Sequence, residues 1–196
     1  MNICFNLKQQ GVDKINYAMM QKAMSDIQAG KPILMTPDQE SACIQKELQK
    51  GQKKIQAETA KKAAATKRMG EAFLENNAKR PGVITLPDGL QYEILKKSDS
   101  MTGSPRAQDT VLANYVGTLI DGKEFDNSYK RNEPLKICAK DVIKGWTEIL
   151  QMMHPGDKWK VYIPSDLGYG DNDSGPIPGG SVLVFDMELL KVIPGQ

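Results

Sequence analysis

The chain has 196 residues, of which 40% are hydrophobic, 26% charged and 6% aromatic, with a formal net charge of +2. This length favours one or two domains with a real core, and so small a net charge selects no class of partner. The three cysteines lie far apart, without CxxC or metal-ligand spacing, which indicates neither a disulfide framework nor a zinc site. We expect no metal and no cofactor.

The N-terminal residues MNICFNLKQQ lack the basic and apolar regions of a signal peptide, which by itself favours a cytoplasmic chain. A chain from which a leader had been removed would look the same. No apolar run approaches the ~18–20 residues that span a bilayer, so we expect no membrane span.

Residues 13–30 predict the first helix, because apolar side chains recur on one face at Tyr17, Met20, Met24 and Ile27. A single short helix cannot bury such a face alone. Two partners fit the sequence: the start of the next helix in the same chain, or a second chain, since methionine adapts well to irregular interfaces.

A much longer helix is predicted from TPDQE, where Thr36 is the cap, Pro37 suits the first position and Gln39 completes a capping box. It continues to about Asn77, and the following NNAKRPG ends it. Forty helical residues span about 60 Å at ~1.5 Å each. Because the apolar stripe is thin, we interpret this helix as a stalk rather than a core helix or a full coiled coil.

Charge is distributed unevenly, with a net charge of 0 over residues 1–45, +6 over residues 46–80 and −4 over residues 81–196. The basic middle is compatible with nucleic-acid binding, but no aromatic residues are interleaved with the charges for base stacking. We therefore favour a solvated helix face and expect no nucleic-acid partner.

From residue 83 the pattern changes to strands and turns. Strands are predicted in GLQYEILKK, PLKIC, DKWKVYIP and SVLVFDMELLKV, and DTVLANYVGTLIDGKEFDNS predicts a hairpin turning at Asp121-Gly122. One short helix, DVIKGWTEILQMM, interrupts them. The pattern predicts an α+β fold, an antiparallel sheet curled around one short helix and preceded by an all-α N-terminal region.

The residues available for catalysis exclude several mechanisms. The single histidine, His154, precedes Pro155 in a turn, which leaves almost no material for histidine acid–base or Ser-His-Asp catalysis. The segment DNDSG begins like a calcium loop, but Pro176 stands where glycine is needed and Val182 where the closing glutamate is needed. A polar turn is the better interpretation, and the remaining candidates are aromatic and aliphatic.

Four of the strings in this region, GKEFDNS, VIKGW, IPSDLGYG and LVFDMELL, have separations that resemble the FKBP-type peptidyl-prolyl cis-trans isomerases. The upstream strings LPDGLQYEIL, NLKQQGV and DIQAGKPILMT are similar to the macrophage infectivity potentiator branch. In that bacterial branch, helical N-terminal regions dimerise and a long helix carries each catalytic domain. The resemblance implies a dimerisation region over 1–35, a linker helix over 36–80 and an isomerase domain over 81–196. It also favours contact between two chains for the Met face, and the cell envelope or periplasm for localisation.

Carried over residue by residue, the resemblance implies a proline-binding pocket. Its catalytic residues would be Asp126, Ile143 and Tyr169, and its substrate-binding residues Tyr115, Phe125, Leu135, Val142, Trp146, Ile177 and Phe185. Trp146 would form the floor under the proline ring, and residues 169–180 a flap. At Leu135 many members have an aromatic wall, and at Pro176 a second aliphatic residue. FKBP-type macrolide inhibitors are expected ligands whose affinity depends on these two departures.

Rotation about an X-Pro bond is opposed by a barrier of about 18–20 kcal/mol, because amide resonance is lost. A twisted amide is less polar than a planar one, so an apolar pocket stabilises it preferentially. Asp126 has two interpretations, orientation of Tyr115 or a backbone group, which we favour, and electrostatic action on the twisting carbonyl. The implied function is a folding helper that isomerises X-Pro bonds in protein clients. The alternatives are a binding module without activity and a chaperone that acts mainly through its helical arms.

Overall fold

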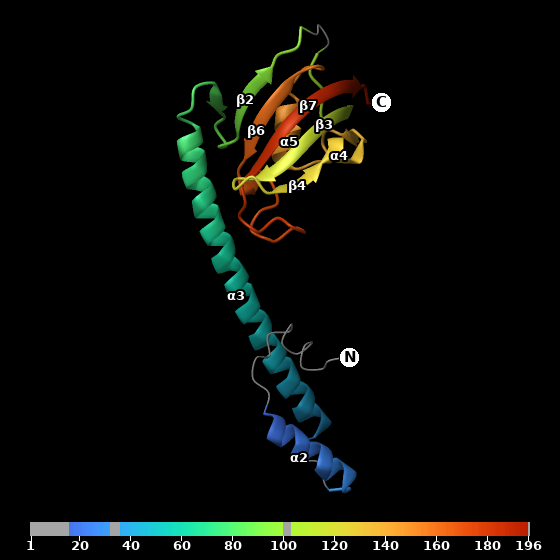
Figure 1. The fold of residues 1–196 in the computed structure, drawn as a ribbon. Coiled ribbons are helices and arrows are strands. Elements are labelled where there is room, and N and C mark those ends of the chain that lie inside the picture. Colours follow the sequence, from blue (N-terminus) through green and yellow to red (C-terminus); the bar gives the residue numbers. More distant parts are fainter. Residues whose placement is uncertain (1–15, 32–35, 100–102, 196) are drawn as a thin grey trace. The chain divides into compact units, whose positions relative to one another are not determined.

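The computed structural model describes residues 16–31, 36–99 and 103–195, with element labels as in Figure 1. The chain divides into two compact units, Met1–Thr59 and Ala60–Gln196. Residues 13–15 of the first predicted helix, together with Cys4, lie outside the described residues. None of the helices in the described ranges is long and apolar enough to cross a membrane.

The first unit contains α2 (Tyr17–Gln28) and the beginning of α3 (Pro37–Asn77). Asn16 caps α2, because its side chain accepts a hydrogen bond from the N–H of Met19 at 3.1 Å. No residue of α2 is buried, so the described part of this unit leaves the apolar face of the helix exposed. At the start of α3 the predicted capping box is confirmed. The Gln39 N–H donates to Thr36 Oγ1 at 3.3 Å, and the Thr36 N–H donates to Gln39 Oε1 at 3.0 Å.

The second unit contains an antiparallel sheet in the order β1-β2-β6-β7-β3-β4, with β5 paired to β3. Its elements are β1 (Val83–Thr85), β2 (Gln91–Lys96), β3 (Thr110–Leu119), β4 (Glu124–Asn127), α4 (Ser128–Arg131), β5 (Leu135–Cys138), α5 (Lys144–Leu150), β6 (Lys158–Ile163), η1 (Ser165–Leu167) and β7 (Leu183–Ile193). The predicted α+β class and antiparallel sheet are confirmed.

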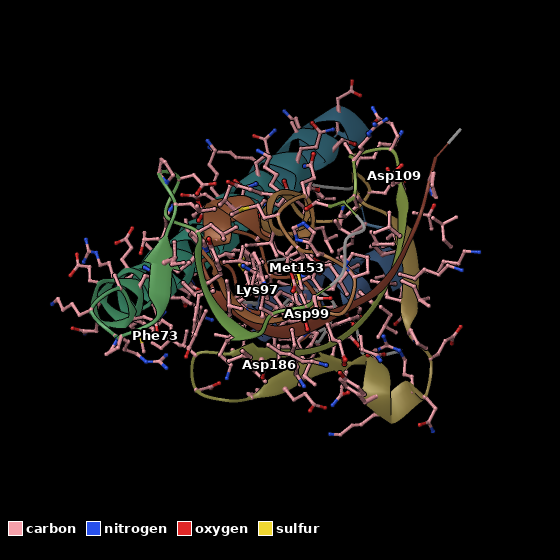
Figure 2. All side chains as sticks on the ribbon, turned by 90° about the horizontal axis from the view of Figure 1, so that it is seen from above. Phe73, Lys97, Asp99, Asp109, Met153 and Asp186 are labelled. Carbon is pink, nitrogen blue, oxygen red and sulfur yellow. The ribbon has the colours of Figure 1, made fainter. Side chains whose placement is uncertain are left out.

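The core of this unit lies between the sheet and α5. Ile149, Leu150 and Met153 are fully buried there, and Met153 lies among the central side chains in Figure 2. On β3, buried and half-buried residues alternate along the whole strand, because successive side chains point to opposite faces. The central strand β7 places Phe185 on the core side, whereas its neighbour Asp186 lies 3.4 Å from the Nζ of Lys160.

The last turns of α3, residues 60–77, pack within the second unit. The buried Asn77 donates to the side chain of Gln91 at 2.8 Å, and Gln91 in turn donates to the carbonyl of Leu74 at 3.0 Å. The rings of Phe73 and Tyr162 lie 5.9 Å apart. These contacts join the end of the helix to strands β2 and β6.

Short turns complete the frame around the site. The predicted hairpin between β3 and β4 turns at Gly122, whose φ of +84° is one that glycine adopts without strain. Three short elements, β1, α4 and η1, were not predicted. Of these, α4 follows β4 directly, is capped by Asn127 and ends at Asn132 in the left-handed region.

Candidate functional site

A pocket of about 440 Å³ opens between the sheet, α5 and the flap, which we define as residues 169–180. Nine of the ten sequence-predicted site residues line it, namely Tyr115, Phe125, Asp126, Leu135, Val142, Ile143, Trp146, Tyr169 and Phe185. The tenth, Ile177, does not line it; this flap residue is 5% exposed and is buried in the core. Two lining residues, Ile137 and Asp141, were not predicted.

Two aromatic rings, those of Tyr115 and Phe185, pack edge-to-face on Trp146 in this pocket. The ring of Trp146 lies 5.0 Å from that of Tyr115 and 5.2 Å from that of Phe185, at interplanar angles of 88° and 85°. Phe125 meets Phe185 in the same edge-to-face manner at 5.6 Å. This arrangement is favourable for aromatic quadrupoles, and each ring limits the rotation of its neighbours. The apolar floor and walls are therefore held in place before any ligand binds.

Gly117 on β3 makes room for two of these rings. A Cβ atom at this position would lie 2.7 Å from the ring of Phe125 and 2.8 Å from that of Phe185. Such distances are too short for carbon atoms in contact. The pocket walls thus depend on the missing side chain of a strand residue that is not itself among the lining residues.

Asp126, at the end of β4, is the centre of a polar network on the pocket rim. Its carboxylate accepts hydrogen bonds from the hydroxyl of Tyr115, from the guanidinium of Arg131 and, at 2.8 Å, from the N–H of Asn127. Arg131 also donates to the Tyr115 hydroxyl at 3.0 Å, and its guanidinium carbon lies 5.7 Å from the centre of the Tyr115 ring.

These contacts determine the charge of the network. Burial tends to raise the pKa of Asp126, but the hydrogen bonds from Tyr115 and Arg131 outweigh it and hold the pKa below its usual value. Burial, together with the hydrogen bond to Asp126, raises the pKa of Tyr115. At neutral pH the rim therefore carries a carboxylate, a neutral phenol and a guanidinium.

Arg131 was not identified from the sequence, although it completes the network. It ends the four-residue helix α4, which begins where the Asn127 side chain accepts from the N–H groups of Tyr129 and Lys130 at 2.9 and 3.2 Å. An asparagine directly after a strand is a cap signal that could have indicated this turn. The turn brings Arg131 back over the ring of Tyr115.

Two further lining residues, Ile143 and Tyr169, offer polar groups to a ligand. Ile143 precedes the first residue of α5, and within the described ranges its backbone N–H donates to no protein acceptor. Tyr169 lies on the flap, and the residue is 45% exposed. In the parts of the chain that the structure describes, no group of three or more His, Cys, Asp or Glu side chains is placed to hold a metal ion.

Comparison with known proteins identifies the family. Residues 102–190 match the family described as FKBP-type peptidyl-prolyl cis-trans isomerase, and residues 1–94 match the domain amino terminal to it. The chain is 41% identical to the outer membrane protein MIP of Legionella longbeachae, over 95% of this chain and 79% of that protein. The chain belongs to the FKBP-type peptidyl-prolyl cis-trans isomerases. The resemblance seen in its motifs is thereby confirmed.

A further relative of this isomerase, FkpA, comes from Escherichia coli. The FKBP-type isomerase FkpA of strain K12 is 47% identical over 71% of this chain and 51% of its own length. The crystal structure of FkpA from the same species has a TM-score of 0.76 at 37% identity, and the match covers 98% of this chain and 89% of that one. The isomerase therefore shares the FkpA fold.

Proposed function

We propose that the pocket binds the proline of an X-Pro segment and accelerates rotation about the preceding amide bond without covalent chemistry. The observation that carries the proposal is the mainly apolar cavity of about 440 Å³ lined by packed aromatic rings. A twisted amide has lost its resonance and some of its polarity, so its transfer from water into this cavity costs less hydration free energy than that of the planar amide. Only such a difference between ground and transition state increases the rate.

In this proposal each lining group has a defined task. Trp146 supports the proline ring, while Tyr115, Phe125 and Phe185 form the walls. The free N–H of Ile143 and the hydroxyl of Tyr169 hold substrate carbonyls. We propose that Asp126 orients Tyr115 in the pocket wall, since its carboxylate accepts a hydrogen bond from the Tyr115 hydroxyl.

The wider role we propose is that of a folding helper for proline-containing protein clients. The relatives support a bacterial cell-envelope setting, because one of them is named an outer membrane protein. We propose that two chains pair through the exposed apolar face of α2, where Tyr17 is 62%, Met24 54% and Ile27 69% exposed. FKBP-type macrolides are proposed as ligands of the same pocket. We expect them to make less contact with Leu135 than with the aromatic residue that many family members have at this position.

The decisive experiment compares two tryptophans that are equally buried. Trp146 is 4% exposed in the pocket, whereas Trp159 is 5% exposed and stacks on Tyr92 at 4.6 Å, outside it. We expect wild type to accelerate cis-to-trans isomerisation of a short X-Pro peptide and Trp146→Leu to abolish most of the acceleration. Trp159→Leu should reduce thermal stability and keep the rate.

Equal rates for the two folded variants would place the activity outside this pocket. Folded wild-type protein that binds the peptide without accelerating its isomerisation would instead indicate a binding module.

A further inference from the structure

Backbone hydrogen bonds connect the two ends of the flap. The N–H of Gly170, the residue after Tyr169, donates to the carbonyl of Ser165 at 2.8 Å. The carbonyl of Gly170 accepts from the N–H of Gly180 at 2.9 Å. Tyr169 is therefore tied through its neighbour to Ser165 before the flap and to Gly180, the last residue of the flap. Since it is 45% exposed, its own packing contributes little to its position.

The short helix η1, which leads into the flap, is attached to α3 by an ion pair. The Nζ of Lys67 lies 2.7 and 2.8 Å from the two carboxylate oxygens of Asp166 in η1, three residues before Tyr169. Both side chains belong to the second unit, in which the end of α3 and the flap can be followed in Figure 1.

The second end of the flap lies directly on the backbone of the same helix. A Cβ atom at Gly180, which has a φ of +78°, would lie 2.2 Å from the carbonyl oxygen of Ala63 and 3.0 Å from the nitrogen of Lys67. A Cβ atom at Gly70 would lie 2.6 Å from Cγ2 of Val182. Glycine at Gly180 and Gly70 lets the helix approach the last residue of the flap and Val182 after it at distances that other residues would prevent.

We propose that Lys67 is a positioning residue of the isomerase reaction: with residues 63–70 of α3 it holds η1, which leads into the flap, and Gly180, which ends it, and thereby keeps Tyr169 in the arrangement that receives substrate. The inference rests on the proposed function of the pocket. Lys67 lies on the helix outside the pocket and acts on substrate only through the flap.

The expected effect follows from the energetics of exposed ion pairs. Such pairs contribute little to global stability, but a flap can open locally without unfolding the domain. When only the closed flap binds substrate, a smaller closed fraction raises the apparent dissociation constant in proportion. Reversing the charge with Lys67→Glu should therefore raise KM about two- to fivefold and leave kcat nearly unchanged.

The experiment uses the full chain and three variants. Lys67→Glu is compared with Lys61→Glu, which makes the same charge change at an exposed position of the same helix. The double variant with Lys67→Glu and Asp166→Lys restores the ion pair with exchanged charges, and we expect it to recover most of the lost affinity. Amide hydrogen exchange at Gly170 and Gly180 should accelerate in Lys67→Glu and remain at the wild-type rate in Lys61→Glu.

A second comparison tests whether Lys67 acts through Tyr169. In a Tyr169→Ala background, Lys67→Glu should cause no further loss of kcat/KM, because the residue being positioned is gone. An additional, independent loss would overturn the proposal, as would identical KM values for Lys67→Glu and Lys61→Glu. If wild type itself failed to accelerate isomerisation, the proposed function would fall, and hydrogen exchange would still decide whether the helix holds the flap.

Discussion

Asp126→Asn removes the negative charge from the centre of the rim network while keeping the size of the side chain. A hydrogen bond to a charged group contributes about 1.5–3 kcal/mol and a neutral one about 0.5–1.5, so the bond from Tyr115 weakens by about 1 kcal/mol. The pair with Arg131 is half exposed, with side-chain exposures of 38% for Asp126 and 44% for Arg131. Loss of this ion pair adds about 0–1 kcal/mol to the cost of the substitution.

The expected total is about 1–2 kcal/mol, which corresponds to a factor of about 5–30. If Asp126 acts by orienting Tyr115, Asp126→Asn should lower kcat/KM for an X-Pro peptide by a factor within this range. Tyr115→Phe should cause a similar loss, and the double variant should lose no more than Asp126→Asn alone, because both changes act on the same Tyr115–Asp126 hydrogen bond.

The assay is isomerisation of the peptide, combined with chemical denaturation of each variant. Asp186→Asn is the matched control: it alters a half-buried aspartate of the same sheet that pairs with Lys160 rather than with the pocket. We expect this control to change stability and leave kcat/KM intact. The orienting role would be refuted if Asp126→Asn lost far more activity than Tyr115→Phe, since that result requires the charge itself to act on the substrate.

Three more predictions follow from the rim and its surroundings. The pKa of Asp126 lies below its usual 3.8, so the stabilising effect of its carboxylate is fully present above pH 3.8 and is lost as the pH falls through the lowered pKa. The difference in unfolding free energy between wild type and Asp126→Asn should therefore persist at neutral pH and shrink below about pH 4. Gly117→Ala should lose about 1–3 kcal/mol of unfolding free energy and most peptide affinity, because its Cβ collides with the ring of Phe125; a fully active, equally stable variant would contradict the described packing. A hydrogen bond with Asp88, and then burial, raise the pKa of Glu148, so its favourable contribution is present below the usual 4.5 and is lost as the pH rises through the raised value. Glu148→Gln should therefore raise Tm at pH 7 and change Tm little at pH 4. An equal rise in Tm at both pH values would show that ionisation of Glu148 beside Asp88 does not destabilise the fold.

The sequence predicts the regular elements of this protein well because their signals are local. The capping box at Thr36 and Gln39 forms as expected, since cap and partner are three residues apart in the chain. The hairpin at Gly122 follows from a turn that glycine permits. For the pocket, the family motifs place nine of ten residues around one cavity, and their roles there remain proposals.

What the sequence does not predict depends on contacts between distant segments. Arg131 looks like an ordinary basic residue until α4 folds it back over Tyr115. Ile177 has the same apolar character whether it faces a ligand or the core, and the tertiary packing of the flap places it in the core. Gly70, which as a sequence signal only weakens a helix, is instead the place where Val182 packs against it.

The order of the strands also constrains how this chain is made. The last strand, β7, lies inside the sheet and pairs with β3 over ten residues and with β6 over six. Until residues 183–193 have left the ribosome, β3 and β6 have no common neighbour, and the sheet consists of two disconnected pieces. Pairings between such distant segments form slowly. The catalytic domain therefore folds only after its synthesis is nearly complete, and any cellular factor that receives the growing chain meets it without a closed pocket.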